Sequence, residues 1–255
     1  MDMKMKNNFE SLWGKYFGHA ELPISFFYVN ERPSGTQMPK PTTGHRCLVG
    51  DLAKARAGKN VVFDADAIGC TGGKRYLGFT SDLMPDFEYF LSYGIPGKLE
   101  GERYKKSPEL VQQAVKAQPV FKAPGDFIVF KRWDQLEEPD QPVAVIFFAR
   151  PDVLSGVFTL VNFDEKEPNG AFCPFGAGCA TIVQYPYAEQ NSRRPRAVLG
   201  MLDVSARPCV PFDVITLAIP MKKFTRMIGN MEESFLVTDS WRKVKRRISM
   251  AKAGK

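Results

Sequence analysis

Residues 143–148, with the sequence Val-Ala-Val-Ile-Phe-Phe, form the most hydrophobic short run of the chain. A strand that faces water on one side has polar residues at alternate positions, and this run has none. We therefore expect a strand that is fully buried. Such a strand needs partner strands beside it and cover on both faces, so the rest of the chain has to supply both.

Short β-branched and aromatic runs, closed by Pro, Gly or Asn, predict the partner strands. They lie at residues 23–29, 60–63, 127–131, 196–202 and 214–220. Helical spacing of apolar residues predicts helices at residues 8–17 with Asn8 as the cap, 47–58, 109–117 after Ser107 and Pro108, 151–163, from Cys179 onward, 221–235 and 239–250. This pattern predicts an α+β fold in which mixed sheets are flanked by helices.

The polar segment 134–141 separates two stretches of strands and helices. We predict one domain over residues 1–255, made of halves at 1–133 and 142–235 with a basic C-terminal helix at 239–253. Each half begins with an aromatic strand after a proline, then has a cysteine that opens a helix and a later cysteine in a loop. A diverged duplication, giving two similar halves packed on each other, is one explanation of this shared order. Coincidence is the other, since sequence identity between the halves is negligible.

The net charge of +7 comes in part from the C-terminal end, where residues 241–248, Lys252 and Lys255 are rich in cations. A basic terminal helix is usually a solvated surface, and no helix-turn-helix, zinc-finger or RNP pattern accompanies this one. Nucleic-acid binding is therefore not expected, and a basic regulatory protein is a weaker alternative.

No apolar run approaches the roughly 20 residues that a membrane span needs, and the first residues lack the apolar core of a secretory signal. We therefore expect a cytoplasmic protein without a membrane partner. Its expected partner is an unidentified small molecule or redox partner, and the chain could also form a homo-oligomer.

Five cysteines are dispersed along the chain, at Cys47, Cys70, Cys173, Cys179 and Cys209. An odd number without an export signal argues against a disulfide framework. Cys179 is expected to open a helix, where the helix dipole favours the thiolate, and Cys47 is a weaker case of the same arrangement. The glycines that flank Cys70 let backbone amides approach its sulfur, and such contacts help to hold and tune iron–sulfur clusters.

The spacing of these thiols leaves four uses open: inert packing residues, ligands of an iron–sulfur cluster, zinc ligands, or a catalytic nucleophile. No C-x-x-C or H-x-x-x-H pair is present, and the gap from Cys173 to Cys179 is wider than structural zinc knuckles use. Dispersed cysteines in Gly-rich loops suit a cluster at the junction of several segments. Free cysteines, however, usually pack as small hydrophobic residues.

Other candidate groups carry weaker signals. His45 lies two residues before Cys47 and could ligate a metal or move a proton. Asp64 and Asp66 could act as paired carboxylates, although a capped turn fits them better. Residues 69–74, with the sequence Gly-Cys-Thr-Gly-Gly-Lys, lack the strand and helix context of a phosphate-binding loop, so nucleotide binding is not expected.

Several short motifs follow one another in a distinctive order: Cys47 with the helix to Gly58, residues 68–70, 76–79 and 178–180, the pair Leu199-Gly200, and residues 203–207 and 217–220. In these motifs the chain resembles domain-of-unknown-function family 169, over roughly residues 9–235. The resemblance implies a soluble prokaryotic protein, often from anaerobes, with no characterised enzymatic activity.

The resemblance also bears on the thiols. Cys47, Cys70 and Cys179 match cysteines of the family pattern, and many members have a further cysteine just after the Leu-Gly pair. This chain has Met201 there. A fourth ligand must then come from elsewhere, or one iron of a cluster is open or has a ligand other than cysteine.

Our favoured hypothesis is an iron–sulfur cluster, of the 4Fe–4S type, between the two halves. Cys47, Cys70, Cys179 and Cys209 are its expected ligands, and Cys173 is the second choice for the fourth position. The expected role is redox, sensing or small-molecule binding. The rival hypothesis is a non-metal small-molecule-binding module whose cysteines are structural, and whether any reaction is catalysed is left open.

Overall fold

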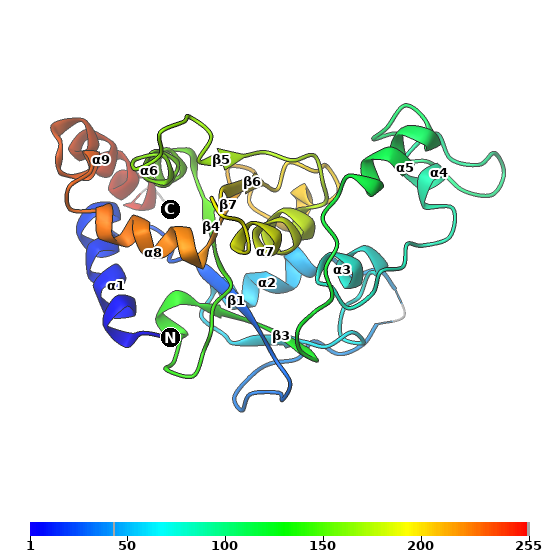
Figure 1. Cartoon of the computed structure of the whole chain (residues 1–255), viewed down its shortest axis with the longest axis horizontal. Coiled ribbons are helices and arrows are strands. Elements are labelled where there is room, and N and C mark those ends of the chain that lie inside the picture. Colours follow the sequence, from blue (N-terminus) through cyan, green and yellow to red (C-terminus); the bar gives the residue numbers. More distant parts are fainter. Residues whose placement is uncertain (43, 254–255) are drawn as a thin grey trace.

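The predicted buried strand is β4 (Ala144–Ala149), and every one of its residues is buried. The computed structural model describes residues 1–42 and 44–253, except for the side chains of residues 251–253. β4 lies in the middle of a seven-stranded sheet with the order β2-β3-β1-β4-β7-β6-β5 (Figure 1). Its neighbours are β1 (Ile24–Val29) and β7 (Ile215–Pro220), and both run antiparallel to it.

The remaining strands extend the sheet on both sides. β3 (Phe127–Arg132) and β2 (Val61–Phe63) follow β1, whereas β6 (Ala197–Gly200) and β5 (Ala171–Phe172) follow β7. β5 pairs with β6 in parallel, and the other pairs are antiparallel. The α+β prediction is confirmed, in the form of one mixed, open sheet. Strands from the two predicted halves meet at the β1–β4 pair, and a duplication stays a prediction.

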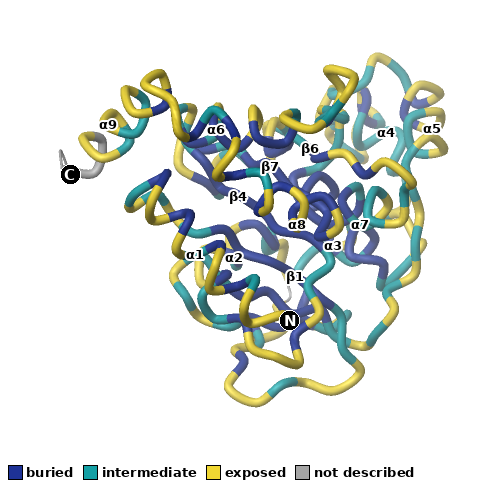
Figure 2. Tube along the Cα trace, turned by 60° about the vertical axis from the view of Figure 1, so that its left-hand side comes forward, coloured by how far each residue is buried: buried dark blue, intermediate teal, exposed yellow. Residues whose placement is uncertain are grey.

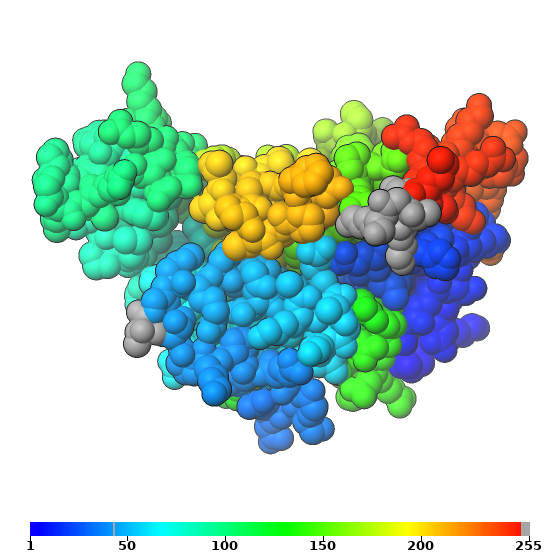
Figure 3. Space-filling view, turned by 180° about the vertical axis from the view of Figure 1, so that it is seen from behind, coloured from blue at the N-terminus to red at the C-terminus, as the bar shows by residue number. Residues whose placement is uncertain are grey.

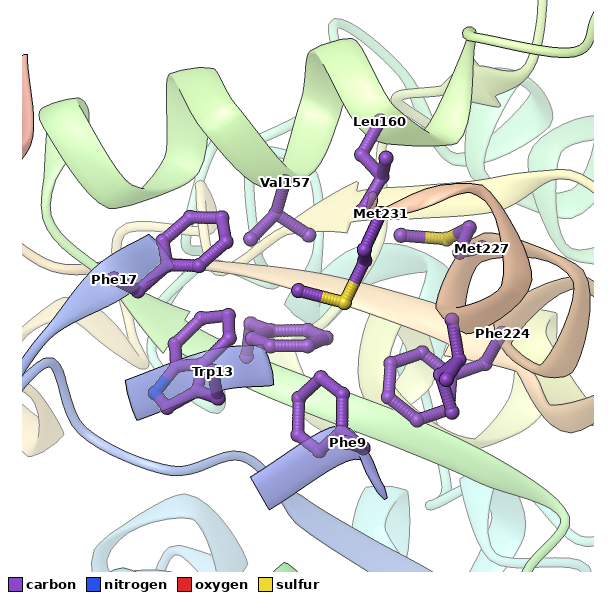
Figure 4. Close-up of a pocket in the computed structure, with 10 residues that line it drawn as sticks. Phe9, Trp13, Phe17, Val157, Leu160, Phe224, Met227 and Met231 are labelled. Carbon is purple, nitrogen blue, oxygen red and sulfur yellow. The ribbon is translucent and has the colours of Figure 1, made fainter. Parts of the chain in front are cut away.

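Four helices cover one face of the sheet: α1 (Met3–Phe17), α6 (Pro151–Val161), α8 (Met221–Asn230) and α9 (Asp239–Ala253). Their apolar side chains meet alternate strand residues such as Phe147, and they interlock in an aromatic cluster (Figure 4). The rings of Phe9 and Phe224 lie 4.9 Å apart between centroids. The void among these side chains is about 10 Å³, room for one water molecule at most. This face is therefore a packed core.

The opposite face is covered by α2 (Leu48–Arg56), α3 (Thr71–Tyr76) and the π-helix η2 (Ala180–Gln184), which continues as α7 (Tyr185–Gln190). These elements pack on the intervening strand residues, among them Phe130 and Ile146. The strands are accordingly buried, while the outer surfaces of the helices are exposed (Figure 2). Cys179 belongs to this second core, and Cys47 and Cys209 pack against it.

The chain between α3 and β3 forms a small lobe beside the sheet (Figure 1). It carries α4 (Phe87–Phe90) and α5 (Pro108–Lys116). The hydroxyl of Ser107 accepts a hydrogen bond from the amide of Leu110, so the predicted cap of α5 is confirmed.

Helix boundaries differ from prediction in two places. α1 begins at Met3 rather than at Asn8, because the Asp2 carboxylate accepts hydrogen bonds from two first-turn amides and caps the helix earlier. α8 ends at Asn230, and the predicted extension to residue 235 is a turn that leads into the 3-10 helix η4 (Phe235–Val237). Among residues 1–42 and 44–253, no helix has both the length and the hydrophobicity that crossing a membrane requires.

Candidate functional site: a cluster of four thiols

Cys47 and Cys70 each occupy the N-cap position of a helix on the second face of the sheet. Cys47 precedes α2, and its side chain makes no capping hydrogen bond. Cys70 precedes α3, and its sulfur accepts a hydrogen bond of 3.1 Å from the amide of Gly73. A side chain at Gly73 would clash, since a Cβ there would lie 2.9 Å from the Cys70 sulfur. The glycine therefore makes this backbone contact with sulfur feasible.

Cys179 immediately precedes the π-helix η2 and is the most deeply buried thiol. π-helical turns are rare and frequently occur at functional sites. Here Thr181 donates a hydrogen bond of 2.8 Å to the carbonyl of Gly178, and its side chain fills the space left by Gly200 of β6. The close packing of Thr181 against Gly200 therefore helps to fix the position of Cys179 in the core.

Cys209 ends the 3-10 helix η3 (Arg207–Cys209), within the loop that joins β6 to β7. Arg207 holds this loop together by donating hydrogen bonds to several of its carbonyls, including that of Phe212 at 2.7 Å. The Cys209 thiol lies near the Cys47 thiol. A Cβ on Gly50 of α2 would lie 4.0 Å from the Cys209 sulfur, so this loop sits directly against α2.

These four thiols lie close enough to affect one another's ionisation. Burial, followed by the nearby Cys70 and Cys47, raises the pKa of Cys179 well above its ordinary value. Burial, with a smaller effect from Cys47, raises the pKa of Cys70. Burial and the contact with Cys47 raise the pKa of Cys209 to about 11. The structure therefore brings the four cysteines named from the sequence into one group, which we call the thiol cluster.

Cys173 lies outside the thiol cluster. It is exposed just after β5, and burial alone raises its pKa, without a contribution from another cysteine. His45 is exposed. Asp64 accepts hydrogen bonds from the amides of Asp66 and Ala67, so the capped turn is confirmed for this pair.

Asp203 is a component of the site that the sequence did not single out. One carboxylate oxygen accepts a hydrogen bond from the amide of Gly178, next to Cys179. The other accepts from the amides of Ser205 and Ala206, at 3.0 and 3.1 Å. Asp203 thereby ties the loop that carries Cys209 to the start of η2. The resemblance drew attention to residues 203–207 as a motif, which was the signal available for it.

The lobe approaches the thiol cluster from one side. The side chain of Tyr104 lies near those of Ser205 and Asp203. The ammonium group of Lys105 lies 4.6 Å from the centre of the Phe175 ring, in the loop that leads to Cys179. In the space-filling view the lobe, green at the left, adjoins the yellow segment that contains Cys209 (Figure 3). The lobe therefore contacts two of the loops that form the site.

The donor atoms do not converge on a single point. In the part of the chain that the structure describes, no three His, Cys, Asp or Glu side chains are grouped so that they could hold one metal ion. The four thiols come from the starts of α2, α3 and η2 and from the end of η3.

These observations define a class of protein: an α+β fold with one mixed sheet, which carries a cluster of thiols under the helices of one face. The model of domain-of-unknown-function family 169, described as uncharacterised ArCR, matches residues 15–230. Because this match spans most of the 255 residues, the chain belongs to that family, and the resemblance predicted from the sequence is confirmed. No curated protein and no solved structure matches the chain.

Proposed function

We propose that the thiol cluster binds an iron–sulfur cluster through Cys47, Cys70, Cys179 and Cys209, and that the protein has a redox, sensing or small-molecule-binding role. One observation carries this proposal: Cys70, Cys179 and Cys209, from three separate segments, each lie close enough to Cys47 to interact with it. Thiolates are the usual protein ligands of iron–sulfur clusters, and such a cluster is wider than a single ion. Donors spread around a region rather than a point are therefore compatible with it.

The backbone around the sulfurs also fits such a group. Cys47, Cys70 and Cys179 each precede a helix, where unpaired amides and the helix dipole favour a negatively charged sulfur. The amide of Gly73 already donates to the Cys70 sulfur. Hydrogen bonds of this kind tune the reduction potential of iron–sulfur clusters.

Burial and the proximity of other thiols raise the pKa values of Cys70, Cys179 and Cys209, which favours the protonated form of these three thiols. A raised pKa argues against a nucleophilic role for these three cysteines, because the thiolate is the reactive form. A bound metal group replaces these protons and removes the repulsion between thiolates. A bound cluster would supply one-electron transfer or an iron site that accepts a ligand.

A second candidate is a non-metal small-molecule-binding module with structural cysteines. The burial of Cys179 in the second core favours it, because buried cysteines commonly pack as small hydrophobic residues. In this case Cys179→Ser would reduce stability but remove no chromophore.

Absorption spectroscopy of the anaerobically purified chain distinguishes the two candidates. The iron–sulfur proposal predicts a broad visible band that Cys179→Ser and Cys209→Ser each weaken. Cys173→Ser is the matched control, because its thiol lies outside the thiol cluster, and it should leave the band unchanged. A colourless wild-type protein would overturn the proposal and leave the module with structural cysteines.

A further inference from the structure

A cavity of about 620 Å³ opens at the end of β4. It is open to solvent, and it is lined by that strand end, the N-terminus of α6, the C-terminus of α2, the second half of α9, residues 19–21 and part of the segment 211–214. The five cysteines, all of them in the described part of the chain, do not line it. Its volume falls in the range of about 300–1,000 Å³ that is usual for small-molecule sites.

Three arginines from three different elements project into this cavity, and each is held by a carboxylate. The pairs are Arg56 with Glu21, at 2.6 and 2.8 Å, Arg150 with Asp213, at 2.8 Å, and Arg247 with Asp152, at 3.0 Å. A guanidinium group has five N–H donors, and these ion pairs use one or two of each. The carboxylates thus orient the arginines while most of their donors remain for a ligand.

Apolar surface lies beside these charges. The guanidinium group of Arg56 stacks 4.6 Å from the centre of the Phe148 ring, which fixes its plane. Val153, Val214 and Ile248 also line the cavity. A ligand that fits has a charged group for the arginines and a compact apolar body for this surface.

The sign of the ligand's charge follows from the cavity's surroundings. The three arginines and the three carboxylates paired with them balance in formal charge, so the unused guanidinium N–H donors are what favours an anion. The positive end of α6 adds to the field of the arginines, since no side chain caps this eleven-residue helix and Pro151, Asp152 and Val153 line the cavity.

We propose that this cavity binds a small organic anion, whose carboxylate or phosphate group contacts Arg150 and Arg247 and whose apolar part lies against Phe148. The proposal does not depend on the iron–sulfur hypothesis, because the two sites share no side chain. The loop that carries Cys209 continues into residues 211–214 of the cavity wall, so the two sites are neighbours along the chain.

Isothermal titration of the full chain tests the proposal with four probes: benzoate, phenyl phosphate, inorganic phosphate and benzylamine. We expect benzoate or phenyl phosphate to bind with a Kd of about 1 mM or lower, and the tighter of the two identifies the anionic group. Inorganic phosphate should bind more weakly because it lacks the apolar part. Benzylamine, which carries the same ring with a positive charge, should not bind.

Variants then locate the binding. Arg150→Gln and Arg247→Gln should each weaken the anion by about tenfold or more, since each removes charged hydrogen-bond donors. Arg247 is 71% exposed, so its replacement leaves the fold intact even if Arg150→Gln does not. Arg194→Gln is the control, because it makes the same change of charge in an exposed ion pair outside the cavity. Lack of binding by both organic anions, equal binding of benzylamine or inorganic phosphate, or an unchanged affinity in Arg247→Gln would each overturn the proposal.

Discussion

At the scale of single residues, Gly200 of β6 lies so close to Thr181 that no side chain fits between them. A Cβ on Gly200 would lie 2.1 Å from the hydroxyl oxygen of Thr181 in η2. Thr181 in turn is hydrogen-bonded to the carbonyl of Gly178, next to Cys179. The packing that positions Cys179 therefore leaves no room for a side chain at residue 200.

Gly200→Ala should lower the free energy of unfolding by about 1–3 kcal/mol, because an overpacked core has to shift its side chains or backbone. Urea denaturation monitored by circular dichroism measures this change. Gly229→Ala in α8 is the control, since no atom lies within 4 Å of a Cβ there and alanine favours the helix. Equal stability of the two variants would contradict the packing described for η2.

The ion pair between Glu165 and Lys223 predicts how stability depends on pH. Lys223 is 1% exposed, and its hydrogen bond holds the pKa of Glu165 below the ordinary value of 4.5. A carboxyl whose pKa is lowered by folding stabilises the protein above pH 4.5, and this contribution is lost as the pH falls through the folded-state pKa.

Glu165→Gln should lower the free energy of unfolding at neutral pH by about 1–3 kcal/mol, because Lys223 loses its charged partner. The free energy of unfolding of this variant should then fall less between neutral pH and about pH 3 than that of the wild type. Denaturation midpoints across this pH range provide the measurement. Glu167→Gln, in a pair whose side chains are 58% and 61% exposed, should change neither value appreciably. A Glu165→Gln protein with the pH profile of the wild type would contradict the account.

The residues of the site were predictable only in part. Cys179 and Cys47 could be placed at helix starts because glycine lies in the loop before each cysteine and a helical segment follows it. Asp203 could not be identified in this way, because a single aspartate in a loop forms no pattern. Its role depends on Gly178, which is 25 residues away along the chain.

At the scale of whole elements, Trp241 is the most deeply buried side chain of α9 among residues 239–250, and it anchors the helix together with the partly buried Val244 and Ile248. Trp241 is 3% exposed, packs edge-on against Phe17 and Phe235, and donates a hydrogen bond of 2.8 Å to the carbonyl of Tyr16. Gly156 of α6 makes room for it, since a Cβ there would lie 2.3 Å from the indole ring. Helix α9 is otherwise rich in lysine and arginine.

Trp241→Ala should detach α9 and lower the free energy of unfolding by about 3–5 kcal/mol, as expected for removal of a buried tryptophan. Hydrogen exchange followed by mass spectrometry should show loss of protection in α9 while β4 stays protected. Trp241→Phe keeps the aromatic packing and should retain most of the protection. Protection of α9 in the alanine variant would show that other contacts hold this helix.

Elements with a clear pattern of apolar residues or a capping motif were predicted from the sequence. A helix that depends on a particular hydrogen bond, α3, was missed. β4 follows from an uninterrupted apolar run, and α5 follows from Ser107 and Pro108 at its start. Helix α3 contains Gly72 and Gly73, which disfavour helix, and it forms where the Cys70 sulfur accepts the amide of Gly73. A helix of this kind has no helical periodicity in its sequence from which it could be predicted.

At the scale of the whole molecule, the β1–β4 pair joins the two predicted halves in the centre of one sheet. Helices α1 and α8, one from each half, also interlock through Phe9 and Phe224. Separating the two halves would expose these side chains and disrupt the core formed by α1, α6, α8 and α9 on one face of the sheet. We therefore expect a single cooperative unfolding transition, with superimposable curves from tryptophan fluorescence and far-ultraviolet circular dichroism. Two separated transitions would indicate that the halves fold independently.

The thiol cluster is likewise a property of the whole fold, because its four cysteines come from both halves. No single segment has the ligand spacing of a known metal motif, and the sheet alone brings α2, α3, η2 and η3 together. If these thiols hold an iron–sulfur cluster, the folded protein and the bound cluster should stabilise each other.

Iron and acid-labile sulfide content of the full chain, purified without oxygen, is the decisive test of the proposed iron–sulfur site. We expect iron and sulfide to copurify with the protein in nearly equal amounts and Cys47→Ser to reduce both together. Protein that folds normally but contains neither iron nor sulfide, even after anaerobic incubation with ferrous iron and sulfide, would contradict this proposal.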